Sequence, residues 1–158
     1  MNHRQSDIPS EWLILDGRPD KDIWQTVSKL PRHTGILVLH HELGGRERRK
    51  LMRLLTRFGG MRRLTIVDEA GRNAARVHNV KELRRAMISR TRLILLSPMF
   101  HTRSHPEWKA LPRMRAAALA RLARRRAIAL GGMNRGRFRS IRKLGFIGWA
   151  GIDAWIRT

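Results

Sequence analysis

Two glycine-bearing turns in the last third of the chain have residue types that suit phosphate binding. Gly131 and Gly132 follow a short apolar run and precede a helical pattern that Asn134 would cap, and Gly151 ends the next apolar run. Glycine lets backbone N–H groups approach a ligand, and a helix N-terminus adds partial positive charge. A glycine pair between strand and helix is also an ordinary tight turn, but two such ends in succession are typical of the phosphate site of a barrel. We therefore predict a phosphate site here.

A polar loop after the apolar run Arg92–Ser97 offers further groups for a ligand. Its hydroxyl, guanidinium and imidazole side chains belong to Ser97, His101, Thr102, Arg103, Ser104 and His105. Hydroxyls and guanidinium groups donate hydrogen bonds to anions, and histidine titrates near neutral pH. An irregular surface loop is the alternative, but a long polar loop at the active face is more often functional.

Titratable side chains also follow two other apolar runs. His78 ends a weak run just before a helical pattern that begins near Val80, where it could act as a general acid or base. A single histidine in a chain with seven is also compatible with a purely structural role. Asp68 and Glu69 follow another run and could hold Mg²⁺ beside a phosphate substrate. A salt bridge to a surrounding arginine is the more common role of such carboxylates.

Seven apolar runs alternate with helical patterns and would position these groups. The expected strands are Trp12–Leu15, Gly35–His40, Arg63–Val67, Ala75–His78, Arg92–Ser97, Arg126–Leu130 and Phe146–Ile152. The expected helices are Asp20–Leu30, Gly45–Phe58 (ended by Gly59 and Gly60), Val80–Ser89, Pro112–Arg125 and Asn134–Leu144. Apolar strands with intervening helices are typical of parallel βα units. Their functional groups lie at the carboxyl ends of the strands.

The length limits which parallel fold can form. The chain has 158 residues and no low-complexity linker, so we expect a single domain over residues 1–158. An eight-unit barrel usually takes about 200–250 residues. The sequence therefore predicts an α/β fold with about seven parallel strands, either a truncated (β/α) TIM-type barrel or an open doubly wound sheet. A truncated barrel has open strand edges, which a homodimer would cover.

The charge balance is strongly positive. The chain has 34 Lys+Arg against 12 Asp+Glu, a net charge of +22. The arginines alternate with apolar residues at helical spacing, which favours solvated helix faces, but nonspecific binding of polyanions such as nucleic acid is the alternative. The chain has no cysteine, which excludes disulfides and thiolate metal sites. No apolar run reaches the roughly 18–20 residues that span a bilayer. We expect a cytoplasmic protein that does not insert into membranes.

The segments that carry these candidate groups resemble a known family. RLILLSPMFHTRSHP, AIALGGM and GFIGWAGIDAW resemble, in this order, motifs of the thiamine-phosphate synthase and thiazole tautomerase (TenI) family. VHNVKELRRA is similar to the family segment in which a histidine precedes a glutamate-containing helix. The resemblance covers roughly 75–156, about half of the chain.

The resemblance implies a (β/α)₈ phosphate-binding barrel and a place in thiamine biosynthesis. It implies a thiazole phosphate as ligand, held by Thr102, Ser104, Gly131, Gly132, Ala150 and Gly151. Contacts from Ser97, Arg103 and His105 would add to these. His78 falls at the position of the tautomerase's catalytic histidine.

The chain departs from the family at the diphosphate and metal half of the site. His40, His41 and Glu42 stand where the synthase has an Arg-Glu-Lys-type motif, and Asp68 only loosely matches a Mg²⁺ ligand. Only about nine residues separate Asp68 from His78, so one βα unit is expected to be missing. Three functions stay open: condensation with hydroxymethylpyrimidine diphosphate as a transferase, metal-free tautomerisation as an isomerase, and noncatalytic binding of a phosphate ligand or nucleic acid.

Overall fold

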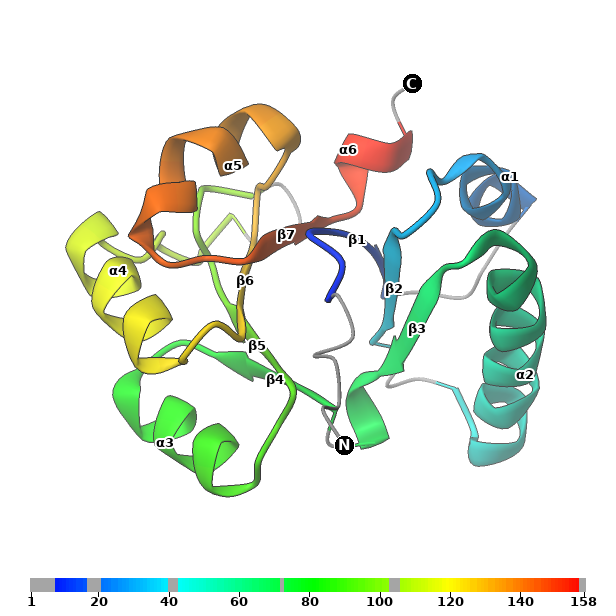
Figure 1. Ribbon diagram of the computed structural model, residues 1–158, viewed down its shortest axis with the longest axis horizontal. Helices are drawn as coiled ribbons and strands as arrows, with labels where there is room; N and C mark the ends of the chain where they lie inside the picture. Colours follow the sequence, from blue (N-terminus) through cyan, green and yellow to red (C-terminus); the bar gives the residue numbers. More distant parts are fainter. Residues whose placement is uncertain (1–7, 17–20, 40–42, 72, 103–105, 157–158) are drawn as a thin grey trace, which may run out of the picture.

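The protein folds into a curled sheet of seven parallel strands with helices on its outer face (Figure 1). The computed structural model describes residues 8–16, 21–39, 43–71, 73–102 and 106–156. The strands are β1 (Glu11–Leu15), β2 (Gly35–Val38), β3 (Thr65–Asp68), β4 (Ala74–Val77), β5 (Leu93–Leu96), β6 (Ala127–Leu130) and β7 (Gly148–Gly151). They are ordered β3-β2-β1-β7-β6-β5-β4. This confirms the prediction of a truncated barrel with about seven parallel strands.

Helices follow most of the strands. They are α1 (Lys21–Lys29), α2 (Gly45–Arg62), α3 (Val80–Ile88), α4 (Arg113–Leu122), α5 (Arg135–Ile141) and α6 (Asp153–Ile156), with the 3₁₀ turns η1 (Glu69–Gly71) and η2 (Arg142–Leu144). Side chains of Asn79 and Asn134 cap α3 and α5 by accepting hydrogen bonds from backbone N–H groups three residues on. The expected cap at Asn134 is therefore confirmed, and Gly145 ends η2 with a left-handed φ of 110°.

Alternate residues of each strand pack on opposite faces of the sheet, as the period of two requires. Trp12 and Ile14 belong to a cluster with Leu37, Leu95 and Ile128. Their strand neighbours pack instead against the helices: Leu13 and Leu15 belong to a cluster with α1 and α2, and Ile94 and Leu96 to one with α3 and α4. Burial on both faces explains why the strands read as continuous apolar runs.

The large Trp12 side chain fills the space beside Gly35, so this position requires a glycine. Trp12 pairs with Gly35 across β1 and β2, and a Cβ added to Gly35 would lie 2.1 Å from the Trp12 ring. Only a residue without a side chain leaves this space for the indole. The indole nitrogen of Trp12 also donates a hydrogen bond to the carbonyl oxygen of Pro9 at 2.6 Å.

The sheet is open between β3 and β4, its two edge strands. These strands follow one another in the sequence, and only η1 with its flanking residues joins them. A complete barrel would place a further strand and helix at this point. The expected loss of one βα unit between Asp68 and His78 is therefore confirmed.

Two predicted helix ends are wrong. Helix α4 ends at Leu122 rather than Arg125, because Arg124 and Arg125 have left-handed φ values of 49° and 61°. Helix α2 continues through Gly59 and Gly60 to Arg62, and Arg63 caps it with a left-handed φ of 56°. A Cβ on Gly59 would lie 3.1 Å from the Ile66 side chain, so this glycine lets the helix approach β3 closely. Gly59 therefore serves helix packing, and neither glycine of the pair ends the helix. Among the described residues, no helix is long and apolar enough to cross a membrane.

Candidate functional site

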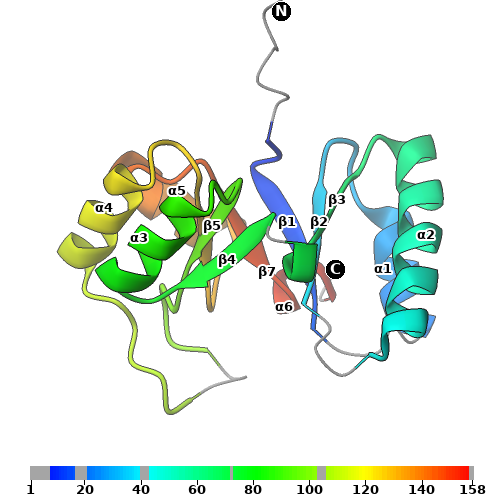
Figure 2. The same ribbon diagram turned by 90° about the horizontal axis from the view of Figure 1, so that it is seen from below.

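The carboxyl ends of the strands open into one cavity. Because all pairings are parallel, these ends lie at the same end of the barrel, together with the loop after β5 and helix α6 (Figure 2). The cavity has a volume of about 1600 Å³. Among its lining residues are Ser97, Thr102, Gly131, Gly132, Met133 and Gly151.

The two predicted glycine turns lie side by side. A Cβ added to Gly151 would lie 3.1 Å from the carbonyl oxygen of Met133 in the neighbouring turn. Gly131 and Gly132 have φ values of +94° and +60°. These conformations suit glycine far better than any residue with a side chain. The strand ends of β6 and β7 are thus brought together as the sequence predicted.

The Gly131–Gly132 turn also packs tightly against the segment after β5. A Cβ on Gly131 would lie 2.9 Å from Pro98 Cα, and one on Gly132 would lie 2.6 Å from the carbonyl oxygen of His101. The backbone N–H of Phe100 donates to the carbonyl oxygen of Gly131 at 3.1 Å. The loop that carries Thr102 is therefore anchored directly on the glycine turn.

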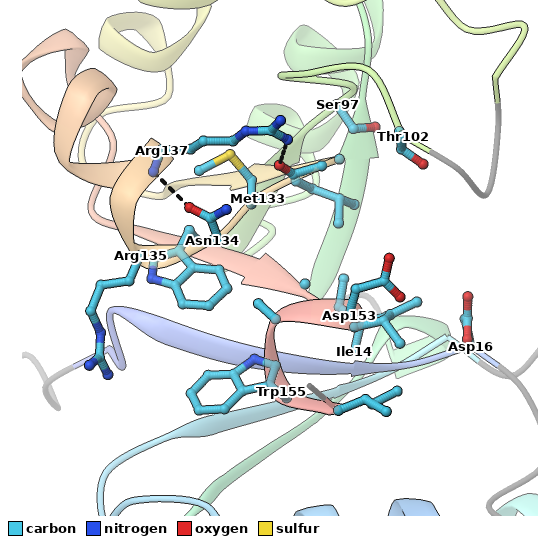
Figure 3. A pocket seen from close by; sticks show the side chains of 18 of the residues that line it. Ile14, Asp16, Ser97, Thr102, Met133, Asn134, Arg135, Arg137, Asp153 and Trp155 are labelled. Atoms are coloured by element: carbon cyan, nitrogen blue, oxygen red, sulfur yellow. Dashed lines mark hydrogen bonds between the residues drawn. The ribbon is translucent and has the colours of Figure 1, made fainter. Parts of the chain in front are cut away.

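Arg137 supplies a cation at this turn. Its guanidinium donates a hydrogen bond to the carbonyl oxygen of Gly132 and lies over the Phe100 ring, 5.0 Å from the ring centre. Its backbone N–H donates to the side chain of Asn134 at 2.8 Å (Figure 3). The neighbouring Arg135 is paired instead with Glu11. Arg137 is thus the arginine of this helix held against the glycine turn.

Backbone donors are available in the same turn. Within the described part of the chain, the N–H groups of Gly132 and Met133 donate to no other protein group. Unpaired N–H groups beside a guanidinium are a suitable environment for an anion. Ala150 contributes differently, because it is fully buried among the residues inside the barrel and only its backbone could reach a ligand.

Two carboxylates face the same cavity. Asp16 follows β1 and Asp153 begins α6, and both line the cavity opposite Ser97 and Thr102 (Figure 3). Carboxylates repel a phosphate but accept hydrogen bonds from N–H and O–H groups. The cavity therefore has a donor-rich side at the β5–β6 loops and an acceptor-rich side at β1 and α6.

His78 lies in a hydrogen-bonded chain rather than in the cavity lining itself. Its Nε2 is 3.3 Å from the Ser97 hydroxyl, and its Nδ1 is 3.0 Å from a carboxylate oxygen of Glu82. The same Glu82 oxygen accepts the backbone N–H of His78 at 2.7 Å. The Trp108 ring meets the imidazole edge-on, with ring centres 5.8 Å apart. His78 thus reaches the cavity through Ser97.

Glu82 is held in its ionised form by these contacts. Burial acts to raise its pKa, but the hydrogen bonds from the His78 backbone and ring and from Asn79 outweigh burial, so the pKa lies below its usual value. A carboxylate without a proton can only accept hydrogen bonds. Glu82 therefore fixes a proton on Nδ1 of His78.

Asp68 lies elsewhere, in an ion pair with Arg48. Both carboxylate oxygens accept hydrogen bonds from the Arg48 guanidinium, and one also accepts the N–H of Ala70 at 2.9 Å. The hydrogen bond from Arg48 lowers the Asp68 pKa; burial opposes it and the Ala70 N–H adds to it. A metal ion at Asp68 would have to displace Arg48, so this arrangement does not fit Mg²⁺. No cluster of three or more metal-ligating side chains is found among the described residues.

The structure describes only part of the residue set predicted from the sequence, and it adds residues that the prediction missed. Arg103, Ser104 and His105 fall outside the described residues. Arg137 and Glu82 were missed, although each lies three residues after a capping asparagine, where a side chain returns toward the helix start. No sequence signal could have placed Trp108 against His78, because Trp108 lies in the irregular segment between β5 and α4, which has no regular period.

Comparison with known proteins gives a fold relationship. No family model and no curated protein matches the sequence. A solved structure that is similar to this one is the thiamine phosphate pyrophosphorylase from Pyrococcus furiosus, with a TM-score of 0.75 over 96% of this chain and 89% of that one. The two sequences are 14% identical, so this likeness establishes the shared fold alone.

Proposed function

We propose that this protein binds a phosphorylated thiazole-type small molecule and acts in thiamine biosynthesis. The observation that carries this proposal is the adjacency of the Gly131–Gly132 turn and the end of β7 at Gly151, with Arg137 against the first turn. The fold shared with a thiamine phosphate pyrophosphorylase and the residue motifs both support it.

The phosphate would take the donor-rich side of the cavity. The free N–H groups of Gly132 and Met133 would bind its oxygens, with a hydroxyl from Thr102 and the guanidinium of Arg137 nearby. The remainder of the ligand would extend along the cavity toward Asp16 and Asp153. An anchored phosphate fixes the position of the attached ring and so lowers the entropic cost of a reaction on that ring.

Proton transfer within the bound ring is the reaction that this site supports best. Such a tautomerisation needs a placed ligand and a base, and His78 with Ser97 provides the base. Condensation with a diphosphate needs cationic stabilisation of the leaving diphosphate, usually by a metal ion. Because the Arg48 guanidinium donates to both carboxylate oxygens of Asp68, this carboxylate is not available to a metal ion, and the transferase reaction is our second choice.

Ligand-induced thermal stabilisation tests the binding. Thiazole phosphate at millimolar concentration should raise the melting temperature, because a ligand that binds only the folded state stabilises it by mass action. Gly132→Asp should abolish the shift by placing a carboxylate among the phosphate donors. Gly60→Asp is the matched control, since Gly60 is exposed and has no atom within 4 Å of its Cβ position.

An outcome in which the wild type shows no shift would remove the phosphate-pocket proposal. Parallel assays then separate the reactions: one supplies both synthase substrates with Mg²⁺, and the other follows thiazole isomerisation without metal. Turnover in the first assay would reverse our ranking of the two reactions.

A second candidate function is polyanion binding at the opposite end of the barrel. Arg63, Arg90, Arg124 and Arg125 have left-handed backbone conformations in turns that precede β3, β5 and β6. Such positions usually take glycine, so their occupation by arginine concentrates charge on this end at some cost in backbone strain. Binding to a nucleic acid here should weaken steeply with salt and be unaffected by Gly132→Asp.

A further inference from the structure

Glu82, His78 and Ser97 form a continuous relay from the surface of α3 to the cavity. The carboxylate-to-Nδ1 distance is 3.0 Å and the Nε2-to-hydroxyl distance is 3.3 Å. The chain of contacts joins an acid, a base and a hydroxyl in the order that activates a serine nucleophile. Each member comes from a different place: helix α3, the turn before it, and the end of β5.

The relay has a defined proton arrangement. Since Glu82 can only accept, the neutral His78 ring has its proton on Nδ1 and a lone pair on Nε2. The Ser97 hydroxyl therefore donates its hydrogen to Nε2, and the lone pairs of its oxygen point away from the imidazole. The Trp108 ring covers part of the imidazole, which limits the ways in which the ring could turn.

The Ser97 position suits attack on a ligand in the cavity. Ser97 is 4% exposed, yet it lines the cavity, so a reacting group has to enter the cavity to reach it. The adjacent Pro98 packs against the Gly131–Gly132 turn, with 2.9 Å between Pro98 Cα and a Cβ built on Gly131. Among the residues that the structure describes, the N–H groups of Gly132 and Met133 donate to no other protein group, which makes them candidates to stabilise an oxyanion.

We propose that Ser97 is a nucleophile, activated by His78 and oriented by Glu82, that cleaves small carboxylic esters. This activity goes beyond the proposed function, since it needs no phosphate ligand and no metal. The substrate class is an ester or thioester whose acyl group fits the cavity.

The proposed reaction is ester hydrolysis, with water as the second reactant. The Ser97 oxygen bonds to the acyl carbon while its proton moves to Nε2 of His78, and the bond to the leaving alcohol or thiol breaks as that proton is returned to the leaving group. A water molecule then attacks the acyl-serine, again through Nε2. This second step releases the carboxylic acid and restores the Ser97 hydroxyl.

Covalent labelling tests the nucleophile on the full chain. A small fluorophosphonate should form one adduct, because the Ser97 oxygen bonds to phosphorus and fluoride leaves. Peptide mapping of the wild type should place this adduct on Ser97 without recourse to any variant. His78→Ala should slow labelling by about 10²-fold or more, the usual contribution of a general base. Glu82→Gln should also slow labelling, because an amide can donate to Nδ1 and so permit the wrong tautomer.

Matched variants control for folding and surface chemistry. Ser28→Ala and Glu47→Gln alter an exposed serine and an exposed glutamate on other helices and should label like the wild type. Hydrolysis of p-nitrophenyl acetate should be lost in Ser97→Ala. The proposal is overturned if the folded wild type takes no label, if the adduct maps to another residue, if Glu82→Gln labels at the wild-type rate, or if Ser97→Ala keeps the wild-type ester hydrolysis. If the wild type shows no phosphate-induced thermal shift, the phosphate-pocket proposal fails but Ser97 can still take the label, so the two proposals can fail separately.

Discussion

A methyl group at Gly132 should destabilise the protein measurably, whereas one at Gly60 should not. Alanine at Gly132 would have to keep a φ of +60°, and its Cβ would lie 2.6 Å from the carbonyl oxygen of His101. A left-handed alanine costs roughly 1–2 kcal/mol, and relief of the backbone contact adds to this. We expect a total loss of about 1–3 kcal/mol. For a chain of this length each kcal/mol corresponds to about 2–4 °C in melting temperature.

The matched substitution acts in the opposite direction. Gly60 lies in helix α2 with no atom within 4 Å of its Cβ position, so Gly60→Ala should raise stability by up to about 1 kcal/mol. Urea unfolding followed by circular dichroism measures both changes, with equal m-values showing that the denatured state is unaltered. Gly132→Ala with wild-type stability would refute the argument that the turn must be glycine. It would also weaken the case that the turn is built for close approach of a ligand.

Three further predictions test the packing, the caps and the electrostatics. Leu95→Ala should lower the free energy of unfolding by about 2–5 kcal/mol, since Leu95 is 1% exposed inside the barrel; a smaller loss in urea unfolding would mean that the interior is loosely packed. Asn79→Ala should cost about 1 kcal/mol by the same assay through loss of the α3 cap, and an unchanged midpoint would contradict the capping role. The depressed pKa of Asp68 stabilises the fold above the ordinary value of 3.8, and that contribution is lost as pH falls through the lower folded value. Asp68→Asn should therefore be less stable than the wild type at neutral pH and should converge with it in acid, whereas a constant difference from pH 7 to pH 2 would argue against the ion pair.

Strand and helix positions follow from local patterns, so most of them could be predicted from the sequence. Strands such as β5 are apolar on both faces because the barrel interior and the outer helices each bury one face. Asn134 and Gly145 show their roles by residue type alone, as a cap and a left-handed stop. The same reasoning failed at Gly59, where a long-range contact with Ile66 decides the role of the residue. Helix stops and close-packing glycines have the same local pattern.

The candidate site could be predicted in part for the same reason. Parallel topology brings all carboxyl ends together, so Ser97, Thr102 and the glycine turns could be grouped without coordinates. The hydrogen bond between His78 and Ser97 depends on β4 lying next to β5. The sequence pattern could predict the order of these strands but not the contact between the two side chains. The Arg48–Asp68 pair spans 20 residues between a helix and a strand, and no local signal distinguishes it from a metal ligand.

Amide chemical shifts report most directly on whether the two glycine turns bind an anion. Titration of the ¹⁵N-labelled protein with thiazole phosphate should shift the N–H resonances of Gly132 and Met133 most, with smaller changes at Ile152 and Asp153 in the neighbouring turn. Saturation of these shifts together would show one site formed by both turns. Shifts confined to the arginine-rich helices, or spread evenly over the surface, would contradict the account and leave only general attraction between a cationic fold and an anion.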